Sequence, residues 1–329
     1  MSPTRSASLA LSLAILSACA APVINYTTIS VPEEGGVKFT QYTVDEENLV
    51  YPVIQRNEIS GILEWYAAPL IAVSADGTRL AFIGRKNEKA NIFIKNTEGG
   101  RSTIQRTFRE RVGDVSFSPD GSKLAFSDIS SDDSNIFLIN ASEGAAVQQI
   151  TSTTQTEVGP NFSPDGQTIY FSKSDGGRYY VWSVNLSTWL LTQYAEGFTP
   201  VIAKNGQELV ITRNNKTTLR GEIWLINLQK GTETLVLSDE NRGFSSPQIS
   251  PDGSVIVCVG TSEKSASAPE NLNIFTVKPD GTSLTQLTFH PGHDVSPVWG
   301  PDGQSIYFIS QRGNPAGNYN LWKMNFSNR

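Results

Sequence analysis

The chain has 329 residues, of which 38% are hydrophobic and 18% charged, enough apolar material for one large folded unit or two ordinary ones. Its net charge of −6 and its pI of about 5.1 argue against the basic surface that binds nucleic acids. The 15 Phe, 10 Tyr and 6 Trp stand against only 2 Met, a balance typical of β proteins.

The N-terminal segment has the features of a secretory signal. The run "SLALSLAILSAC" at 8–19 is apolar, yet shorter than the roughly 20 residues of a transmembrane helix. It ends in Leu-Ser-Ala-Cys, which resembles the lipobox of bacterial lipoproteins. The resemblance implies that residues 1–18 are removed, that the Cys19 thiol is lipidated and that 19–35 form a lipid-anchored linker. The alternative is an ordinary signal peptide that contains a cysteine.

The location within the cell follows from the same segment. A lipid on Cys19 would hold the chain at a membrane of the bacterial cell envelope. Ala20 follows the lipid-bearing position and is not the aspartate of a retention signal, so the outer membrane is expected in a Gram-negative cell.

From about residue 69 the chain repeats one turn motif, Ser-Pro-Asp-Gly or a close variant, at intervals of 40 to 50 residues. Each copy is followed by a short apolar strand such as "LAFI" and then by a second one such as "NIFI". A period in the forties with this texture predicts an all-β propeller with six blades of four strands. The closing glycines of the copies are Gly77, Gly121, Gly166, Gly206, Gly253 and Gly303.

The serine and aspartate of this motif could form a catalytic pair or a cation loop, or the motif could be a hairpin turn. Proline suits the second position of a type I turn, and glycine takes the positive φ at its end. The copy "SADG" at 74–77 lacks the proline, and "AKNG" at 203–206 lacks both serine and aspartate. Only the glycine is common to all copies, which favours a turn between the first and second strands of each blade.

The last blade needs a strand from elsewhere, because only "NLWKMNF" follows its second strand before Arg329. The fourth strand of the fifth blade reads "LTQLT" at 284–288, and "FTQYT" at 39–43 matches it position by position. We therefore expect residues 37–43 to complete the last blade and close the ring, so that the propeller covers 36–329.

The block "LTQLTFHPGHDVSPVWGPDGQSIYFISQRGNPAGNYNLWKM" at 284–324 resembles the WD40-like propeller repeats of TolB, the periplasmic component of the Tol–Pal system. The resemblance covers about 69–325. TolB also carries an α/β domain ahead of its propeller, whereas only about fifty mature residues without a helical pattern precede the first blade here. The closer resemblance is to stand-alone TolB-like propeller lipoproteins of the bacterial envelope.

The sequence lacks the common motifs for catalysis and cofactor binding. It has no Gly-x-Ser-x-Gly elbow, His-Glu-x-x-His, Cys-x-x-Cys or phosphate-binding glycine loop. We therefore expect a non-catalytic protein-binding scaffold without a cofactor. The alternatives are a carbohydrate- or cell-wall-binding propeller and a glycan-cleaving lyase or hydrolase with its site at the channel mouth.

Two loops could hold an ion. His290, His293 and Asp294 stand together in "HPGHD" and could ligate zinc, although Pro-Gly between the histidines predicts an ordinary loop. "DISSDDS" at 128–134 carries Asp128, Asp132 and Asp133, whose spacing is not that of an EF-hand. A solvated loop is the expectation in both places, and a calcium or zinc ion is the alternative.

The loops between second and third strands and those between blades are long and varied, and such loops usually carry binding. We expect them to share one face, here called the loop face, which would bind another envelope protein or a cell-wall component. The alternative is that they are solvated loops, and the oligomeric state is left open. The candidate contacts are the arginines and aromatics of these loops: Arg85, Arg109, Arg111, Arg178, Tyr179, Phe198, Arg213, Arg242, Phe244 and Arg312.

Overall fold

The computed structural model describes residues 31–34, 37–43, 54–56, 63–65, 69–97, 103–130, 133–142, 146–262, 271–313 and 318–326. Cys19 and the expected signal peptide lie outside these ranges. The regular elements in them are strands, and no helix among them has the length and apolar character needed to cross a membrane.

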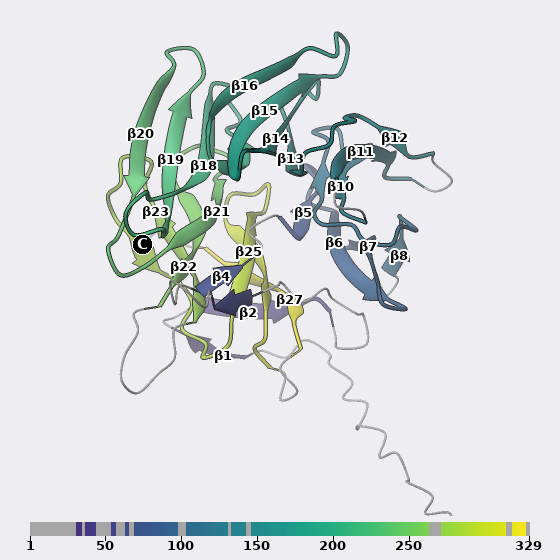
Figure 1. Cartoon of the computed structure of the whole chain (residues 1–329). Coiled ribbons are helices and arrows are strands. Elements are labelled where there is room, and N and C mark those ends of the chain that lie inside the picture. Colours follow the sequence, from purple (N-terminus) through teal and green to yellow (C-terminus); the bar gives the residue numbers. More distant parts are fainter. Residues whose placement is uncertain are drawn as a thin grey trace, which may run out of the picture.

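The strands form six sheets around a common axis (Figure 1), which confirms the predicted propeller. Blade 1 comprises β5 (Ile71–Val73), β6 (Arg79–Lys86), β7 (Lys89–Asn96) and β8 (Thr103–Gln105). Blade 2 comprises β9 (Ser116–Phe117), β10 (Lys123–Asp128), β11 (Asn135–Asn140) and β12 (Gln148–Gln149). Blade 3 comprises β13 (Glu157–Phe162), β14 (Thr168–Asp175), β15 (Arg178–Asn185) and β16 (Leu191–Glu196).

The second half of the chain continues in the same order. Blade 4 comprises β17 (Phe198–Ile202), β18 (Glu208–Asn214), β19 (Gly221–Asn227) and β20 (Thr232–Leu237). Blade 5 comprises β21 (Phe244–Ile249), β22 (Ile256–Thr261), β23 (Leu272–Val277) and β24 (Thr285–Gln286). Blade 6 begins with β25 (Asp294–Trp299), β26 (Ser305–Ser310) and β27 (Asn320–Asn325). A separate hairpin pairs β3 (Ile54–Arg56) with β4 (Leu63–Trp65).

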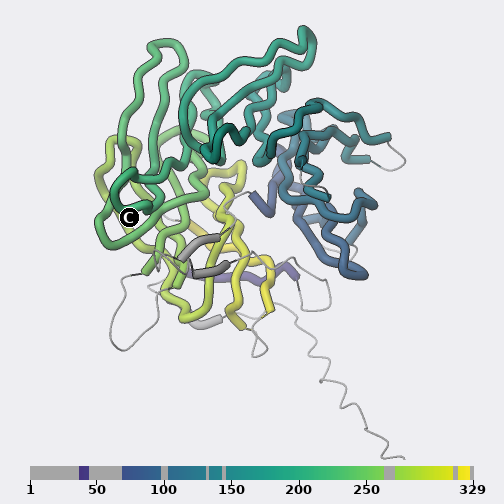
Figure 2. Tube along the Cα trace, in the orientation of Figure 1, coloured from purple at the N-terminus to yellow at the C-terminus, as the bar shows by residue number. Residues whose placement is uncertain are grey.

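The N-terminal segment closes the ring, as predicted. β2 (Val37–Gln41) pairs antiparallel with β27, with Phe39 opposite Met324 and Gln41 opposite Trp322. In Figure 2 this purple segment lies beside the yellow C-terminal strands. Within the segment expected to form the linker, 19–35, β1 (Val31–Glu34) pairs with the outer side of β2 and makes blade 6 five-stranded. β1 thereby covers an edge that β2 would otherwise leave open.

A Gln-x-Thr motif ends the outer strands of blades 1, 2, 5 and 6 and explains why "FTQYT" resembles "LTQLT". In each copy the glutamine amide donates to the threonine carbonyl, and the threonine hydroxyl accepts the backbone N–H of a residue of the third strand. The amide-to-carbonyl distances are 2.7–2.9 Å in the pairs Gln41–Thr43, Gln105–Thr107, Gln149–Thr151 and Gln286–Thr288. The donors to the hydroxyls, at 2.8–2.9 Å, are Leu321, Ile92, Ile136 and Ile274.

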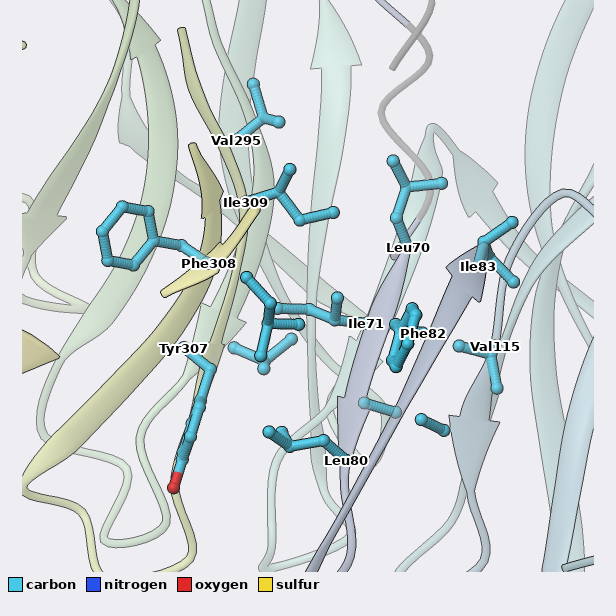
Figure 3. Close-up of a cluster of buried hydrophobic side chains, with 14 of the residues drawn as sticks. Leu70, Ile71, Leu80, Phe82, Ile83, Val115, Val295, Tyr307, Phe308 and Ile309 are labelled. Carbon is cyan, nitrogen blue, oxygen red and sulfur yellow. The ribbon is translucent and has the colours of Figure 1, made fainter. Parts of the chain in front are cut away.

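The hydrophobic core is continuous across the junction of blades 6 and 1, where the N-terminal strand closes the ring. The largest hydrophobic cluster runs through blades 5, 6, 1 and 2 and includes Phe39 of β2. Figure 3 shows Ile71 of β5 between the side chains of β26 and those of β6, with Phe308 of β26 on one side and Phe82 of β6 on the other. Burial of apolar surface at the closure therefore holds blades 6 and 1 together as it does the other neighbouring blades.

Candidate functional site

The first strands of all six blades surround a central channel. It contains a cavity of about 450 Å³ whose lining reaches the turns that follow the first strands. We call the end of the molecule formed by these turns the turn face. The turn residues at the cavity are Ser74, Ala75, Pro119, Pro164, Lys204, Ser250, Pro251 and Pro301.

The channel narrows away from the turn face because the first strands of blades 3 to 6 are bulged. Each bulge has a residue of positive φ followed by a proline: Gly159, Thr199, Ser246 and Ser296 have φ of 67°, 52°, 51° and 51°. A second cavity of about 10 Å³ lies among them, enough for about one water molecule. The wide part of the channel is therefore a funnel that opens toward the turn face.

The bulges were missed in the sequence, although a signal for them exists. Proline stands six positions before the closing glycine in blades 3 to 6, at Pro160, Pro200, Pro247 and Pro297. Proline in a strand marks an edge or a bulge, because it cannot donate to the ladder.

In the turns at the mouth of the funnel, the serine and the aspartate form hydrogen bonds within the turn. In blade 1 the Ser74 hydroxyl donates to Asp76 Oδ1 at 2.5 Å, and the N–H of Thr78 donates to the same oxygen at 3.0 Å. The turns of Asp120, Asp165 and Asp252 repeat these bonds. Hydrogen bonds from the serine and from the residue after the closing glycine lower the pKa of Asp76 and Asp120 to about 2. The motif is a turn, and its closing glycines all have positive φ.

Blade 6 keeps this turn although glycine replaces the serine. Ser305, two residues after the closing Gly303, donates to Asp302 Oδ1 at 2.8 Å. A Cβ on Gly300 would lie 2.2 Å from the Ser305 hydroxyl, so this hydroxyl fills the space that the missing side chain leaves. The substitution therefore preserves both the bond to the aspartate and the packing.

Neighbouring turns pack against one another around the mouth. Gly77 of blade 1 lies so close to Pro301 of blade 6 that a Cβ on it would be 3.1 Å from the proline ring. This contact joins the first and last blades. The Arg79 guanidinium donates to the carbonyl of Gly121 at 2.9 Å and joins blades 1 and 2. These contacts join the turns of blades 6, 1 and 2 at the mouth.

The funnel wall is mostly apolar and almost without charge. Among the described residues that line it, only Lys204, which is exposed, is charged. Phe117, Phe162 and Trp299 supply aromatic surface, and Trp299 is fixed because its indole N–H donates to the carbonyl of Gln248 at 3.1 Å. A preformed, largely apolar cavity with few polar groups and one cation suits a peptide segment that carries an acidic group.

On the loop face, part of the predicted set is exposed. Arg85 and Arg178 have side chains 46% and 61% exposed and form ion pairs with Glu88 and Glu196. Tyr179 is 37% exposed and its ring lies 6.3 Å from that of the half-buried Phe198. Arg111 is also exposed.

Three other arginines of that set make contacts inside the propeller. Each pairs with a carboxylate and lies over an aromatic ring, as cation–π contacts require. Arg109 pairs with Asp128 at 3.4 Å and lies over Phe137. Arg213 pairs with Glu233 at 2.9 Å and lies over Trp224. Arg242 pairs with Asp239 at 2.8 Å and lies over Phe244.

Two predicted contacts are wrong, because Arg312 and Phe244 are both 0% exposed. Phe244 packs edge-on against Phe275 inside blade 5. Arg312 donates to Asp294 Oδ2 at 2.7 Å, and its guanidinium lies 3.9 Å from the ring centre of Phe39 and 5.2 Å from that of Phe308. Arg312 therefore fastens the N-terminal strand to blade 6 and does not face a partner.

The residues of "HPGHD" do not converge on a common point. His293 Nδ1 accepts the N–H of Leu272 at 3.2 Å, and His290 Nδ1 accepts that of Gly292 at 3.0 Å. Burial lowers the pKa of His293 and raises that of Asp294, whose carboxylate faces Arg312. In the described part of the chain no group of three His, Cys, Asp or Glu could hold a metal ion.

The acidic loop at 128–134 is described only in part. Asp128 accepts from the Ser130 hydroxyl and pairs with Arg109. Asp132 lies outside the described residues. The calcium alternative therefore stays a prediction.

Comparisons with known proteins agree with this architecture. The family model described as the TolB beta propeller domain matches residues 62–268 and 198–329. A protein assigned as TolB from Agrobacterium tumefaciens is 16% identical, with a TM-score of 0.59 over 84% of this chain and 97% of its own. TolB from Acinetobacter baumannii is 20% identical, with a TM-score of 0.62 over 76% of this chain and 64% of its own.

An enzyme has a comparable likeness. Oligogalacturonate lyase from Vibrio parahaemolyticus is 12% identical, with a TM-score of 0.56 over 91% of this chain and 96% of its own. At such identities the solved structures show the shared fold and nothing of the activity.

Proposed function

The chain belongs to the TolB beta-propeller family, and on this basis we propose that it is a non-catalytic, lipid-anchored binding protein of the bacterial envelope. Its partner would be another envelope protein. The contact would be centred on the mouth of the funnel at the turn face, with a peptide segment of the partner inserted into it.

The observation that carries this proposal is the funnel itself. Its cavity of about 450 Å³ is lined by residues of all six blades, and this volume lies in the range of about 300–1,000 Å³ that is typical of small-ligand pockets. The turns at its rim are held by hydrogen bonds and by contacts between blades, so little ordering is needed when a partner binds. The lone lining cation, Lys204, favours a segment with an acidic side chain or a free carboxyl terminus.

Site-specific photo-crosslinking in cells tests the proposal. A photo-reactive residue at the exposed positions 75 and 204 of the rim should capture the same protein. Capture through position 75 should fall when Lys204 is changed to Glu, because the substitution reverses the charge at the mouth. A rim that captures nothing, or capture that is indifferent to Lys204→Glu, would contradict the assignment.

The loop face remains the rival surface, and the matched position is Arg178. Its side chain is exposed and its ion pair with Glu196 is a surface contact of little energetic value. A photo-reactive residue at position 178 that captures the partner, together with loss of binding in Arg85→Ala and Arg178→Ala, would move the contact to the loop face.

The lipid anchor is tested separately. Metabolic labelling with a fatty acid should label the wild-type chain and not the Cys19→Ser variant, and the variant should leave the membrane fraction. Binding of the partner by the purified variant should be unchanged, because the funnel lies within the propeller. An unlabelled wild-type chain would contradict the anchor and leave the binding proposal standing.

A glycan-cleaving activity is the second candidate, favoured only by the likeness to oligogalacturonate lyase. An oligogalacturonate lyase solved in complex with manganese is 16% identical to this chain, with a TM-score of 0.55. Incubation with oligogalacturonate, with and without manganese, and measurement of the unsaturated product decide the matter. Turnover that is lost in His293→Ala would replace the binding proposal with an enzymatic one.

A further inference from the structure

The outer strands of the propeller differ in how they are protected from pairing with another chain. An unpaired strand edge invites such pairing unless it is short, charged or covered. The outer strands β8, β12 and β24 have only two or three residues, and β1 covers the outer side of β2 in blade 6. In blade 4, β20 carries Glu233, which is paired with Arg213.

Blade 3 is the least protected along most of its outer strand. β16 has six residues, and its one charged residue, Glu196, stands at its end and is paired with Arg178, so residues 191–195 carry no charge. Residues 191–194 are exposed on both faces of the strand, and the preceding Trp189 and Leu190 are 50% and 65% exposed. Figure 1 shows β15 and β16 extending from the ring on the side away from β1 and β2.

The backbone of β16 is arranged to accept another strand. Inside blade 3, Thr192 lies opposite Ser183, and Asn185 N–H donates to the carbonyl of Leu190 at 3.0 Å. Alternation along an antiparallel ladder then directs the backbone groups of Thr192 toward β15 and those of Leu191 and Gln193 outward. An added strand would therefore bond to residues 191 and 193.

The side chains of β16 suit a second copy of itself. In a pair of antiparallel strands related by a two-fold axis through Thr192, this residue faces its own copy, and Leu190 faces Tyr194 of the second copy. Apolar and Thr–Thr pairs in these positions are favourable, and no like charges meet. Two chains that each carry a net charge of −6 would thus meet at an uncharged stretch, residues 190–194.

We propose that the chain forms a two-fold symmetric dimer through antiparallel pairing of β16 with β16 of a second copy, centred on Thr192. The two blades 3 join into one continuous sheet of eight strands across the axis. Trp189 and Leu190 lie at the ends of the added ladder and extend its apolar contact. The funnel mouths and the closures at blade 6 stay outside the interface.

Two variants of opposite charge at position 192 test the symmetry of this interface. In Thr192→Lys and in Thr192→Glu, two like charges would face each other, and self-association should weaken about tenfold or more. An equimolar mixture of the two variants should regain the dimer, because opposite charges then meet. Thr234→Lys on β20 is the matched control: Thr234 is exposed on an outer strand, and the dimer should be unaffected.

Sedimentation of the full chain in mild detergent provides the measurement, and crosslinking gives the register. In a dimer of the Thr192→Cys variant, the two introduced thiols would be close enough for a disulfide under mild oxidation. Cys258 is buried, so the wild-type chain controls for other disulfides. A wild-type monomer at about 0.1 mM, a dimer that survives Thr192→Lys, or a variant mixture that stays monomeric would each overturn the proposal.

Discussion

Blades 6 and 3 stand across the ring from each other and have nearly the same outer-strand sequence, yet they end differently. Blade 6 reads "FTQYT" at 39–43 and blade 3 reads "LTQYA" at 191–195. Thr43 accepts the N–H of Leu321 at 2.8 Å and donates to Asn320 at 3.2 Å, and the strand ends at Gln41. In blade 3 the ladder is bulged between Tyr180 and Trp182, and β16 runs on to Glu196.

We infer from this difference that one hydroxyl group decides how these two outer strands end. Where the outer strand ends in threonine, the threonine hydroxyl accepts the N–H of the third strand, so the backbone of the outer strand can leave the ladder. Where alanine stands in its place, a backbone carbonyl of the outer strand has to accept that N–H, and the outer strand becomes longer. A short outer strand is protected from foreign pairing, whereas a long one is available to a partner.

The largest expected effect lies at the closure of blade 6. Asp294→Ala leaves the Arg312 guanidinium without its carboxylate partner in a fully buried place, and the free energy of unfolding should fall by about 3–5 kcal/mol. Chemical denaturation of the purified protein measures it. The matched control is Arg178→Ala in blade 3, whose exposed pair with Glu196 is worth about 1 kcal/mol or less. Equal losses in the two variants would show that the closure is no stronger than a surface contact.

The next effect tests the threonine hydroxyl directly. Thr43→Val keeps the shape of the side chain but leaves the buried N–H of Leu321 without its acceptor, which costs about 1–3 kcal/mol. Thr107→Val and Thr288→Val should cost as much, because the same bond is made to Ile92 and Ile274. Thr192→Val in blade 3 should change stability by no more than about 0.5 kcal/mol, since this side chain is exposed. A comparable loss in Thr192→Val would show that the cost does not come from the buried hydrogen bond, because the exposed Thr192 makes no such bond to the third strand.

Much of the fold could be predicted because it rests on repeated local chemistry. The turn at Gly121 needs a positive φ wherever it occurs, and the match between "FTQYT" and "LTQLT" reflects one hydrogen-bond pattern. Burial depends on neighbours that one loop does not reveal, which is why Arg312 was expected on the surface. Its loop looks like the others, and only the arrival of Phe39 from the N-terminus encloses it. The funnel was missed for the same reason, since six distant strands form it.

A smaller effect separates turns that touch a neighbour from turns that do not. Gly77→Ala and Gly206→Ala both place a side chain at a φ near +70°, which costs about 1–2 kcal/mol. The new Cβ at position 77 would also meet Pro301 at 3.1 Å, whereas nothing lies within 4 Å at position 206. Thermal unfolding should therefore show the larger loss for Gly77→Ala. The same loss in both variants would mean that the turns of blades 1 and 6 do not support each other.

The smallest effect concerns acid. Hydrogen bonds hold the pKa of Asp120 at about 2 in the folded chain, below its ordinary value of 3.8. A carboxyl group with a lowered pKa stabilises the folded state above its ordinary pKa, and this contribution is lost as the pH falls from about 4 to about 2. In Asp120→Asn the amide oxygen can still accept from the backbone, as Asn205 does in blade 4, where it accepts the N–H of Gln207 at 2.9 Å.

Between pH 5 and pH 2.5 the thermal midpoint of Asp120→Asn should therefore fall less than that of the wild type. The difference should be small, because solvent screens the charge of this exposed group. Combining Asp76→Asn with Asp120→Asn should flatten the profile further, because the pKa of Asp76 is also held at about 2. Asn205→Asp should steepen the profile, since blade 4 would gain a titrating turn. Profiles that overlay for all these variants would show that the turns contribute nothing to acid sensitivity, and would leave the buried Asp294 and Glu157, whose pKa burial raises, as the groups to examine.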